Sequence, residues 1–489
     1  MVQKAGEERI NLKKEGMYEE LKKSIRDCED IATEQLEAGG HQVTIFFQPD
    51  MVDMKRMREY FMPELVHSLS GEGKSFSHLL IENGASRIRD EDTNSGECAS
   101  LIFSGRLLLY FAHRQEFYSI NFANKPHREP EESALEPSIR GARDGFVEEL
   151  DTNIALVRKR LSTPDLSVKY YYSYGTSKTR LALLYFANRV PQVSLSLIRQ
   201  RLENLDQTVL IGGNARLEDV ITGNRYSILP LSNFTGKPDY AAERLARGKI
   251  LVLMDGMPTA MIAPVTLTEL FISPEDSNFS YHAAIASRML RVIAAFITVF
   301  SPGVLISLLM YNQDQIPFQL LSTIGISRLG LPISAFFEML LSLLLLDLLR
   351  EAGARLPRAT GSTITVVGGI IIGDAALRAG ILSPSMTFLA AVAIVSGSTL
   401  VNLNLQSTTR IMRLFVLILS AICGIYGTIL GLFYMLVYAV NTESFGTPYF
   451  TYERYSRKDS LLKFIRLPFR KNNIDLVRSG SPPKGGGTS

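Results

Sequence analysis

Two acidic residues stand inside apolar stretches of this 489-residue chain, where an ionisable side chain is costly and often functional. Glu338 lies about seven residues inside the apolar stretch 331–349, and Asp374 lies near the end of the glycine-rich stretch "TITVVGGIIIGDAAL" at 363–377. In a ring of identical subunits, one carboxylate from each chain would form a collar that selects cations. The alternative for Glu338 is a protonated or arginine-paired side chain that only orients helices, with Arg328 as its partner.

The stretch 363–377 is apolar enough for a bilayer but short for a full span, which needs about 20 residues. Its glycines fit either of two structures. One is close helix packing through Gly369 and Gly373; the other is irregular backbone shielded by protein or lining a water path. The candidate pore or gating residues are Glu338, Val366, Val367, Gly368, Gly369, Ile371, Gly373 and Asp374.

The sequence lacks the usual catalytic and metal-binding motifs. "GEGKS" at 71–75 resembles part of a phosphate loop, but Ser68 stands where the first glycine is required. No HExxH or GxSxG motif occurs. The cysteines are Cys28, Cys98 and Cys423, an odd number without CxxC spacing, which argues against a disulfide framework or a zinc site. We therefore expect no enzyme activity, no metal and no cofactor.

The charge pattern argues against nucleic acid as a partner. The formal net charge is only +3, and no basic stripe interleaved with aromatic residues occurs outside the C-terminal tail. The N-terminus has no apolar core typical of a secretory signal. The first 285 residues are charged and mixed, so we expect them to stay in the cytosol.

Most of the chain between Val292 and Val440 is apolar, which predicts an integral membrane protein with membrane lipid around it. Arginines flank the first two spans and the tail is basic, so these ends belong in the cytosol. We favour four crossings plus a re-entrant segment at 363–377, although Arg410 and Arg413 would then face outward. The alternative lets 363–377 cross fully and the last segment double back at its glycines. The four predicted spans are 292–311, 331–349, 385–403 and 414–440.

The cytosolic half predicts two α/β subdomains, because short β-branched and aromatic runs alternate with stretches of helical periodicity. The first has a strand at 42–47, a helix after it, and strands within 100–122. The second has strands at 166–175, 180–187 and 249–256, with helices between them. The fold class is an α/β cytosolic N-terminal region of two subdomains followed by an α-helical polytopic membrane domain. The predicted domains are a polar segment (1–40), subdomain 1 (41–125), a linker and helix (126–165), subdomain 2 (166–285), the transmembrane domain (286–445) and a basic cytosolic tail (446–489).

Four blocks in register give the chain a family resemblance. They read "EPSIRGARDGFVEELDTNIALVRKR", "DYAAERLARGKILVLMDGMPTAMIAP", "SRLGLPISAFFEMLLSLLLLDLLREAGARLP" and "GSTITVVGGIIIGDAALRAGILSP". In this order they resemble the A subunits of the spore germinant receptors of endospore-forming bacteria, the GerA family. The resemblance extends from about residue 40 to about residue 470.

The resemblance implies a protein of the spore inner membrane, with a transporter-like B subunit and a lipoprotein C subunit as partners. It further implies a homo-oligomer that forms a gated cation channel and triggers germination. A scaffold or accessory paralogue that assembles other germination proteins without conducting ions is the alternative. The residues matching the family signatures are Arg140, Gly141, Arg143, Gly145, Asp239, Asp255, Gly256, Pro258, Arg350, Glu351, Gly353, Arg355 and Pro357.

The signature blocks also have simpler interpretations. "RGARDGF" fits a glycine turn capped by Asp144 as well as a gating contact, and "MDGMP" fits a turn that ends a strand. "TGKPDY" departs from the family pattern, because the acidic residue before the proline is lost. The spacing of Asp347, Glu351 and Arg355 predicts an ion-pair ladder at a helix end.

Overall fold

The computed structural model describes residues 17–71, 76–88, 95–124, 141–174, 178–204, 214–224, 226–355 and 358–450. Its contacts divide the chain into two compact units. The first unit holds both β-sheets, in residues up to 224 and 234–264. The second holds the long helices, in residues 226–233 and from 265 onward. Arg140, Pro357 and the tail beyond residue 450 lie outside the described residues.

The first sheet has the strand order β1-β2-β4-β5-β3 and is antiparallel throughout. Alternate residues of a strand point to opposite faces, so Val43 and Ile45 meet one helical layer while Phe46 meets the other. The first layer contains α2 (Met54–Arg56), the π-helical turn Met57–Phe61, α3 (Met62–Leu69) and α4 (Phe76–Glu82); the second contains helical residues 17–24 and α5 (Ser95–Phe103). The strands are β1 (Ala32–Ala38), β2 (His41–Phe47), β3 (Ser86–Arg87), β4 (Arg106–Phe111) and β5 (Glu116–Asn121).

Two features of this subdomain differ from the sequence prediction. The sheet begins before residue 41, because β1 pairs along its whole length with β2. Residues 100–103, predicted as a strand, form the end of α5 instead. Their apolar side chains fit a buried helix as well as a strand, and short apolar runs do not distinguish the two.

The second sheet has the order β6-β7-β9-β10-β8. Helices α6 (Leu150–Arg158) and α9 (Pro238–Ala246) cover one face of it with Leu150, Ile154, Tyr240 and Leu245. Helices α7 (Gln192–Glu203) and α8 (Asn214–Thr222) complete the subdomain. The strands are β6 (Leu166–Tyr174), β7 (Lys178–Phe186), β8 (Asn233–Thr235), β9 (Ile250–Met254) and β10 (Ala260–Ala263). The two-subdomain α/β architecture predicted for this half is confirmed.

A buried ion pair joins the two subdomains of the first unit. Arg158 of α6 donates to Asp30, just before β1, from Nε over 2.7 Å and from Nη2 over 2.8 Å. Both side chains are fully buried, and the guanidinium lies 3.9 Å from the centre of the Phe103 ring. A parallel bridge between Cys28 and Val168 continues the contact. Because both charges are compensated bidentately, the pair can be buried at moderate cost.

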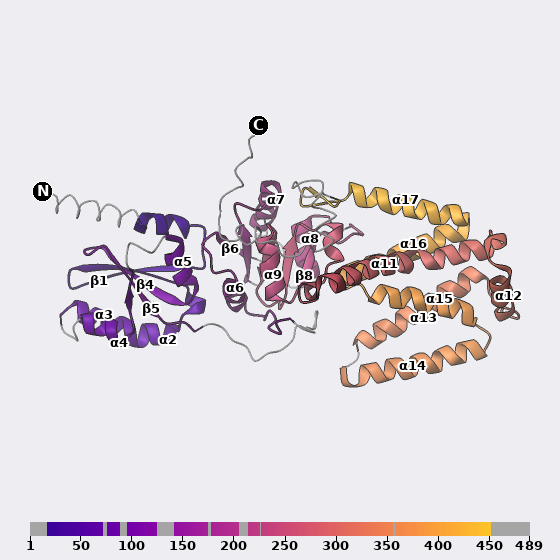
Figure 1. Ribbon diagram of the computed structural model, residues 1–489, viewed down its shortest axis with the longest axis horizontal. Helices are drawn as coiled ribbons and strands as arrows, with labels where there is room; N and C mark the ends of the chain where they lie inside the picture. Colours follow the sequence, from indigo (N-terminus) through magenta and orange to yellow (C-terminus); the bar gives the residue numbers. More distant parts are fainter. Residues whose placement is uncertain are drawn as a thin grey trace, which may run out of the picture. The chain divides into compact units, whose positions relative to one another are not determined.

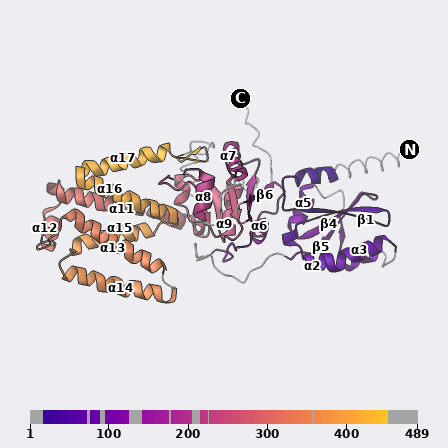
Figure 2. The same ribbon diagram turned by 180° about the vertical axis from the view of Figure 1, so that it is seen from behind.

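The second unit is a bundle of α-helices, with β11 (Glu443–Ser444) and β12 (Thr447–Pro448) after the last helix. Among the described residues, α11 and α16 are long and apolar enough to cross a membrane, while α12, α15 and α17 are shorter apolar helices. Figures 1 and 2 both show α14 beside α13. The helices are α11 (Tyr281–Met310), α12 (Phe318–Ser327), α13 (Ala335–Arg355), α14 (Arg358–Arg378), α15 (Pro384–Ser398), α16 (Leu403–Cys423) and α17 (Ile425–Asn441).

The segment predicted as one last span is two helices. The chain turns at Gly424, whose φ of 62° is in the left-handed region that favours glycine. Ser420 and Thr428 then share a hydrogen bond of 2.7 Å, and Phe415 contacts Tyr434, so α16 and α17 form an antiparallel hairpin. The last segment therefore doubles back, as the alternative topology required.

The glycine-rich stretch 363–377 is regular helix within α14, so of the two structures predicted for it, close helix packing and irregular backbone, the second is not observed. α14 begins after the C-terminal end of α13 and leads to the N-terminal end of α15, where Ser383 N donates to Glu338 Oε1 over 2.7 Å. Since Glu338 is in the first turn of α13, α14 runs from one end of α13 back to the other. A continuous helix along α13 is the geometry that the alternative with a full crossing of 363–377 requires.

Candidate functional site

Sequence blocks that lie far apart in the chain meet at the start of α6 in the first unit. The Phe146 N–H donates to the Gly236 carbonyl over 2.9 Å, which ties "RGARDGF" to "TGKPDY". Asp255 Oδ1 accepts from the Leu150 N–H over 3.2 Å. A carboxylate at this position satisfies a free N–H at the helix start and favours the helix dipole. The signature residues here organise the fold of the second subdomain.

Each signature block is also explained by its local structure. Gly256 has a φ of 82° in the turn between β9 and β10, so the predicted strand-ending turn is confirmed. Asp144 Oδ2 accepts from Arg160 Nη2 over 2.5 Å, which holds the segment beside α6. The remaining residues of these blocks lie as follows: Gly141 is half-buried and Arg143 exposed, Gly145 is buried, Asp239 is in the first turn of α9, and Pro258 is exposed between β9 and β10.

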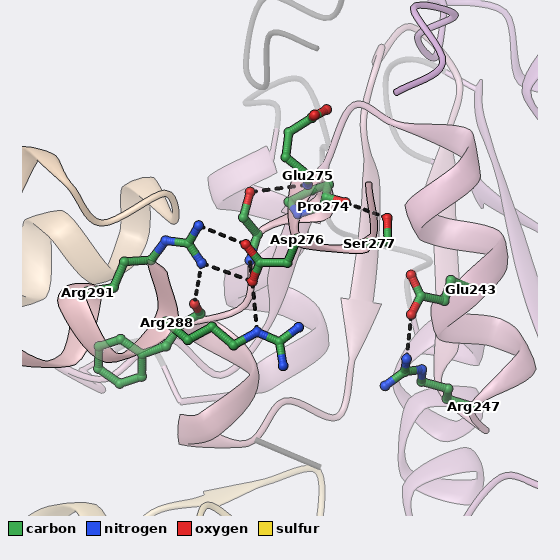
Figure 3. Close-up of polar contacts among 10 residues, drawn as sticks. Glu243, Arg247, Pro274, Glu275, Asp276, Ser277, Arg288 and Arg291 are labelled. Carbon is green, nitrogen blue, oxygen red and sulfur yellow. Dashed lines mark hydrogen bonds and ion pairs between the residues drawn. The ribbon is translucent and has the colours of Figure 1, made fainter. Parts of the chain in front are cut away.

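Buried carboxylates of the second unit are bound by arginines, and Asp276 is one of them. It lies at the end of η4 (Pro274–Ser277) and accepts from Arg288 Nε over 2.9 Å. Arg291 approaches the same carboxylate with Nη2 over 2.8 Å and with Nη1 over 3.0 Å, as Figure 3 shows. Asp276 also completes a capping box with Ser273. Two arginines in the early turns of α11 are thus fixed to the segment that precedes it.

From the sequence, Arg288 and Arg291 were predicted only as cations that flank a span, and no role was predicted for Asp276. The available signal was the "SPED" sequence at 273–276, in which serine is followed three residues later by an acidic residue. A capping box predicts a helical turn, but it gives no information about arginines more than ten residues away.

Glu338 is fully buried and lies within reach of three elements. Its Oε2 accepts from Arg328 Nε over 2.9 Å, and its Oε1 accepts from the Ser383 N–H over 2.7 Å. Arg328 is the C-cap of α12, and Ser383 is the N-cap of α15. The ion pair with Arg328 that we considered is therefore confirmed. Within a single chain the carboxylate faces protein rather than a channel.

Asp347 of α13 lies among three arginines. Its Oδ2 accepts from Arg413 Nη2 over 2.5 Å, and its Oδ1 lies 3.8 Å from Arg410 Nε and 3.9 Å from Arg350 Nη2. Asp347 thus contacts α16 as well as Arg350 of its own helix, while the Glu351–Arg355 step of the ladder predicted along α13 lies outside the described side chains. Arg410 and Arg413 lie within α16 and not in a turn between spans, and Arg413 is buried with 2% of its side chain exposed. Glu351 and Gly353 are on the last turns of α13, as is the backbone of Arg355.

The candidate pore residues other than Glu338 lie on α14, whose main contact is with α13. In α14, Val366, Ile370 and Ile371 are 60%, 66% and 62% exposed, and an added Cβ at Gly369 would contact Leu349 of α13 at 3.7 Å. Gly368 and Gly373 have no heavy atom within 4 Å of such a Cβ among the described residues, and nothing is described of the Val367 side chain. Asp374 pairs with Arg378 on the same helix over 2.8 Å.

No group of three or more His, Cys, Asp or Glu side chains that could hold a metal ion occurs in the part of the chain that the structure describes. The buried carboxylates are instead neutralised by guanidinium groups. Such pairs fix helices relative to one another and need no bound metal.

Comparison with known proteins decides the family. The sequence profile described as "Bacillus/Clostridium GerA spore germination protein" matches residues 19–475. The chain belongs to the GerA family of spore germination proteins. As the resemblance predicted, it is a germinant-receptor A subunit and not an enzyme. Its apolar helices make it a membrane protein.

Several relatives in this family align over most of their length. The chain is 37% identical to spore germination protein XA of Bacillus anthracis over 434 residues, which cover 88% of each chain. It is 29% identical to spore germination protein KA of Bacillus subtilis (strain 168) over 479 residues, or 94% of this chain and 87% of the relative. One solved structure is similar to part of the chain: the crystal structure of the N-terminal domain of the A subunit of the Bacillus megaterium spore germinant receptor GerK3. The similarity covers 50% of this chain and 91% of that chain, with a TM-score of 0.38 and 22% sequence identity.

Proposed function

We propose that this GerA-family chain forms a homo-oligomeric, nutrient-gated cation channel in the spore inner membrane. It would act there with a transporter-like B subunit and a lipoprotein C subunit. The first unit and the basic tail (446–489) would lie in the cytosol. Opening of the channel would release cations and start germination.

The exposed apolar face of α14 supports this proposal. Val366, Ile370 and Ile371 are more than half exposed within this chain. The main contact of α14 within the chain is with α13. The rest of its surface is available to neighbouring subunits, and small residues such as Gly368 and Gly373 allow close approach.

The helix directions support the proposed orientation. α11, α14 and α16 would run outward, and α13, α15 and α17 inward, since α14 runs back along α13, α15 begins beside the start of α13, and α17 runs back along α16. Arg288, Arg350 and Arg410 then lie toward the cytosolic ends of their helices, as the positive-inside rule requires. With six passages, Arg410 and the basic tail would both lie on the cytosolic side.

Substitution of Ile371 by alanine tests the channel role. If Ile371 narrows a closed pore, the smaller side chain will let cations leak, and spores carrying Ile371→Ala will germinate without nutrient. Potassium release from purified spores is the measurement. Ile81→Ala, at an apolar residue that is 78% exposed in the first unit, is the matched control. If spores carrying Ile371→Ala retain their potassium without nutrient and respond normally to nutrient, the result would favour the alternative, a membrane scaffold that assembles other germination proteins.

A further inference from the structure

The cluster around Asp347 contains more positive than negative charge. Three guanidinium groups, those of Arg350, Arg410 and Arg413, lie within 4 Å of the Asp347 carboxylate. Even when Glu351, which lies one turn further along α13 and has a contact of its own, is counted as a second anion, one positive charge remains in excess among the described side chains of the cluster. By contrast, Glu338 pairs with one arginine. An uncompensated cation in a membrane domain is costly and requires an anion.

The hydrogen bonding of the cluster is also incomplete. Arg410 Nε and Arg413 Nε are buried and donate to no acceptor in the described part of the chain, and Asp347 Oδ1 accepts from no donor there. The separations of 3.8 and 3.9 Å from Asp347 Oδ1 are too long for hydrogen bonds. The side chains of Arg350 and Arg410 are 28% and 34% exposed. A ligand can therefore reach these two arginines, while Arg413 stays with Asp347.

The position of the cluster along α16 indicates the depth in the bilayer at which the cluster lies. Thr408 Oγ1 donates to the Ile228 carbonyl over 2.7 Å, and Ile228 belongs to a non-helical segment that precedes the membrane helices. Irregular backbone of this kind belongs outside the hydrocarbon region. Arg410 follows Thr408 by two residues, or about 3 Å along the helix axis. Its guanidinium group therefore lies at headgroup level.

We propose that Arg350 of α13 and Arg410 of α16 form a binding site for the phosphate of an anionic phospholipid headgroup. Arginine binds phosphate oxygens with two parallel N–H donors, which would use donors that the protein leaves free. Basic pockets between membrane helices recognise headgroups in this way. A lipid phosphate fits better than a free anion, because the site opens at the level of the headgroups. The inference depends on the membrane position of the helices and not on ion conduction.

Binding of short-chain phosphatidylglycerol to the detergent-solubilised full chain tests this site. Native mass spectrometry and a titration followed by the thermal midpoint measure it, with phosphatidylcholine of equal chain length and inorganic phosphate as comparison ligands. We expect saturable binding of phosphatidylglycerol only. Arg350→Gln and Arg410→Gln should each weaken it roughly five-fold, as expected for one arginine at an anionic surface.

Two further variants make the result decisive. Arg378→Gln removes an exposed arginine that is paired on α14, so it should bind phosphatidylglycerol like the original chain. Asp347→Asn removes the competing carboxylate and should strengthen binding. Equal binding of both phospholipids, undiminished binding by the folded Arg350→Gln/Arg410→Gln chain, or equally tight binding of inorganic phosphate would overturn the proposal. Because none of these measurements involves ion flux, a negative result leaves the channel proposal to be tested separately.

Discussion

The Arg328 guanidinium donates to a Glu338 carboxylate that is completely buried, over 2.9 Å. The cation caps the C-terminal end of α12, and the anion lies at the N-terminal end of α15, so each charge also favours the dipole of the helix beside it. One ion pair thereby holds α12, α13 and α15 together.

Breaking this pair should destabilise the helical unit. Arg328→Met leaves a buried carboxylate without its cation, and we expect a loss of about 3–5 kcal/mol. The double substitution Arg328→Met/Glu338→Gln should recover much of that loss, because the charge is then removed as well. Thermal unfolding of the solubilised chain by circular dichroism measures both. Arg378→Met, at an exposed pair, is the control; an equal loss in the control would contradict the explanation.

Asp255 should stabilise the second subdomain through α6. Asp255→Ala removes the acceptor for the Leu150 N–H, and loss of a helix cap costs about 1 kcal/mol. Asp255→Asn retains an acceptor oxygen and should cost less. Denaturant unfolding compares the two, and equal losses would show that the ion pair with Arg180, and not the cap, carries the effect.

The stability of the first unit should fall as the pH rises toward the pKa of the Asp50 carboxyl group. Burial, together with the nearby Asp151 and Asp30, raises the pKa of Asp50 from 3.8 to about 6. The folded chain then binds a proton that the unfolded chain has released, so stability decreases between about pH 4 and pH 6 and stays lower above that window. Asp50→Asn should stabilise by roughly 1 kcal/mol at pH 7.5, after allowance for partial exposure, and by nothing at pH 4. Asp165→Asn, at an exposed site, should show no such difference in thermal melts.

The hairpin of α16 and α17 should not tolerate a side chain at Gly427. A Cβ there would lie 2.0 Å from the Leu419 carbonyl oxygen, so the two helices must separate. We expect Gly427→Ala to cost about 1–3 kcal/mol, as overpacking commonly does. Gly373→Ala is the matched control, since nothing described lies within 4 Å of its Cβ and alanine favours a helix. Thermal midpoints that move equally in both would refute close packing at Gly427.

Maleimide labelling should distinguish the reactive cysteine from the two unreactive ones. It should also show on which side of the membrane the reactive cysteine lies. Burial raises the pKa of the Cys28 thiol to about 11 and that of Cys98 to about 12, and both are buried, so neither should react at pH 7. Cys423 is exposed at the end of α16. In the proposed orientation an impermeant maleimide labels it from outside protoplasts, with Cys423→Ser as the control. Labelling only in inside-out vesicles would reverse the orientation.

The sequence predicted what depends on local pattern. Strand and helix periodicity located β2, β6, β7, β9, α6 and α9, and the family blocks identified the chain. It could not predict contacts between distant residues. Asp347 was interpreted with Glu351 and Arg355 because they share a helix face, whereas its closest partner, Arg413, lies 66 residues away.

The backbone conformation at glycines was the second feature that could not be predicted from the sequence, because glycine occurs both at helix ends and inside regular helices. Gly424 ends a helix with a positive φ, while Gly368, Gly369 and Gly373 sit inside a regular helix. The sequence contains glycines in both places and no sign of which backbone they adopt. Only the packing partners, such as Leu349 beside Gly369, distinguish the two cases.

The distribution of ion pairs has a mechanical consequence for α14. The salt bridges Arg328–Glu338 and Asp347–Arg413 join different helices. Asp276 binds Arg288 in the N-terminal part of α11. In the described part of α14, Asp374 pairs with Arg378 of the same helix. Displacing α14 would break none of the interhelical salt bridges that the structure describes and would remove chiefly its apolar contact with α13. A movement of α14 would therefore leave the ion pairs among the other helices intact.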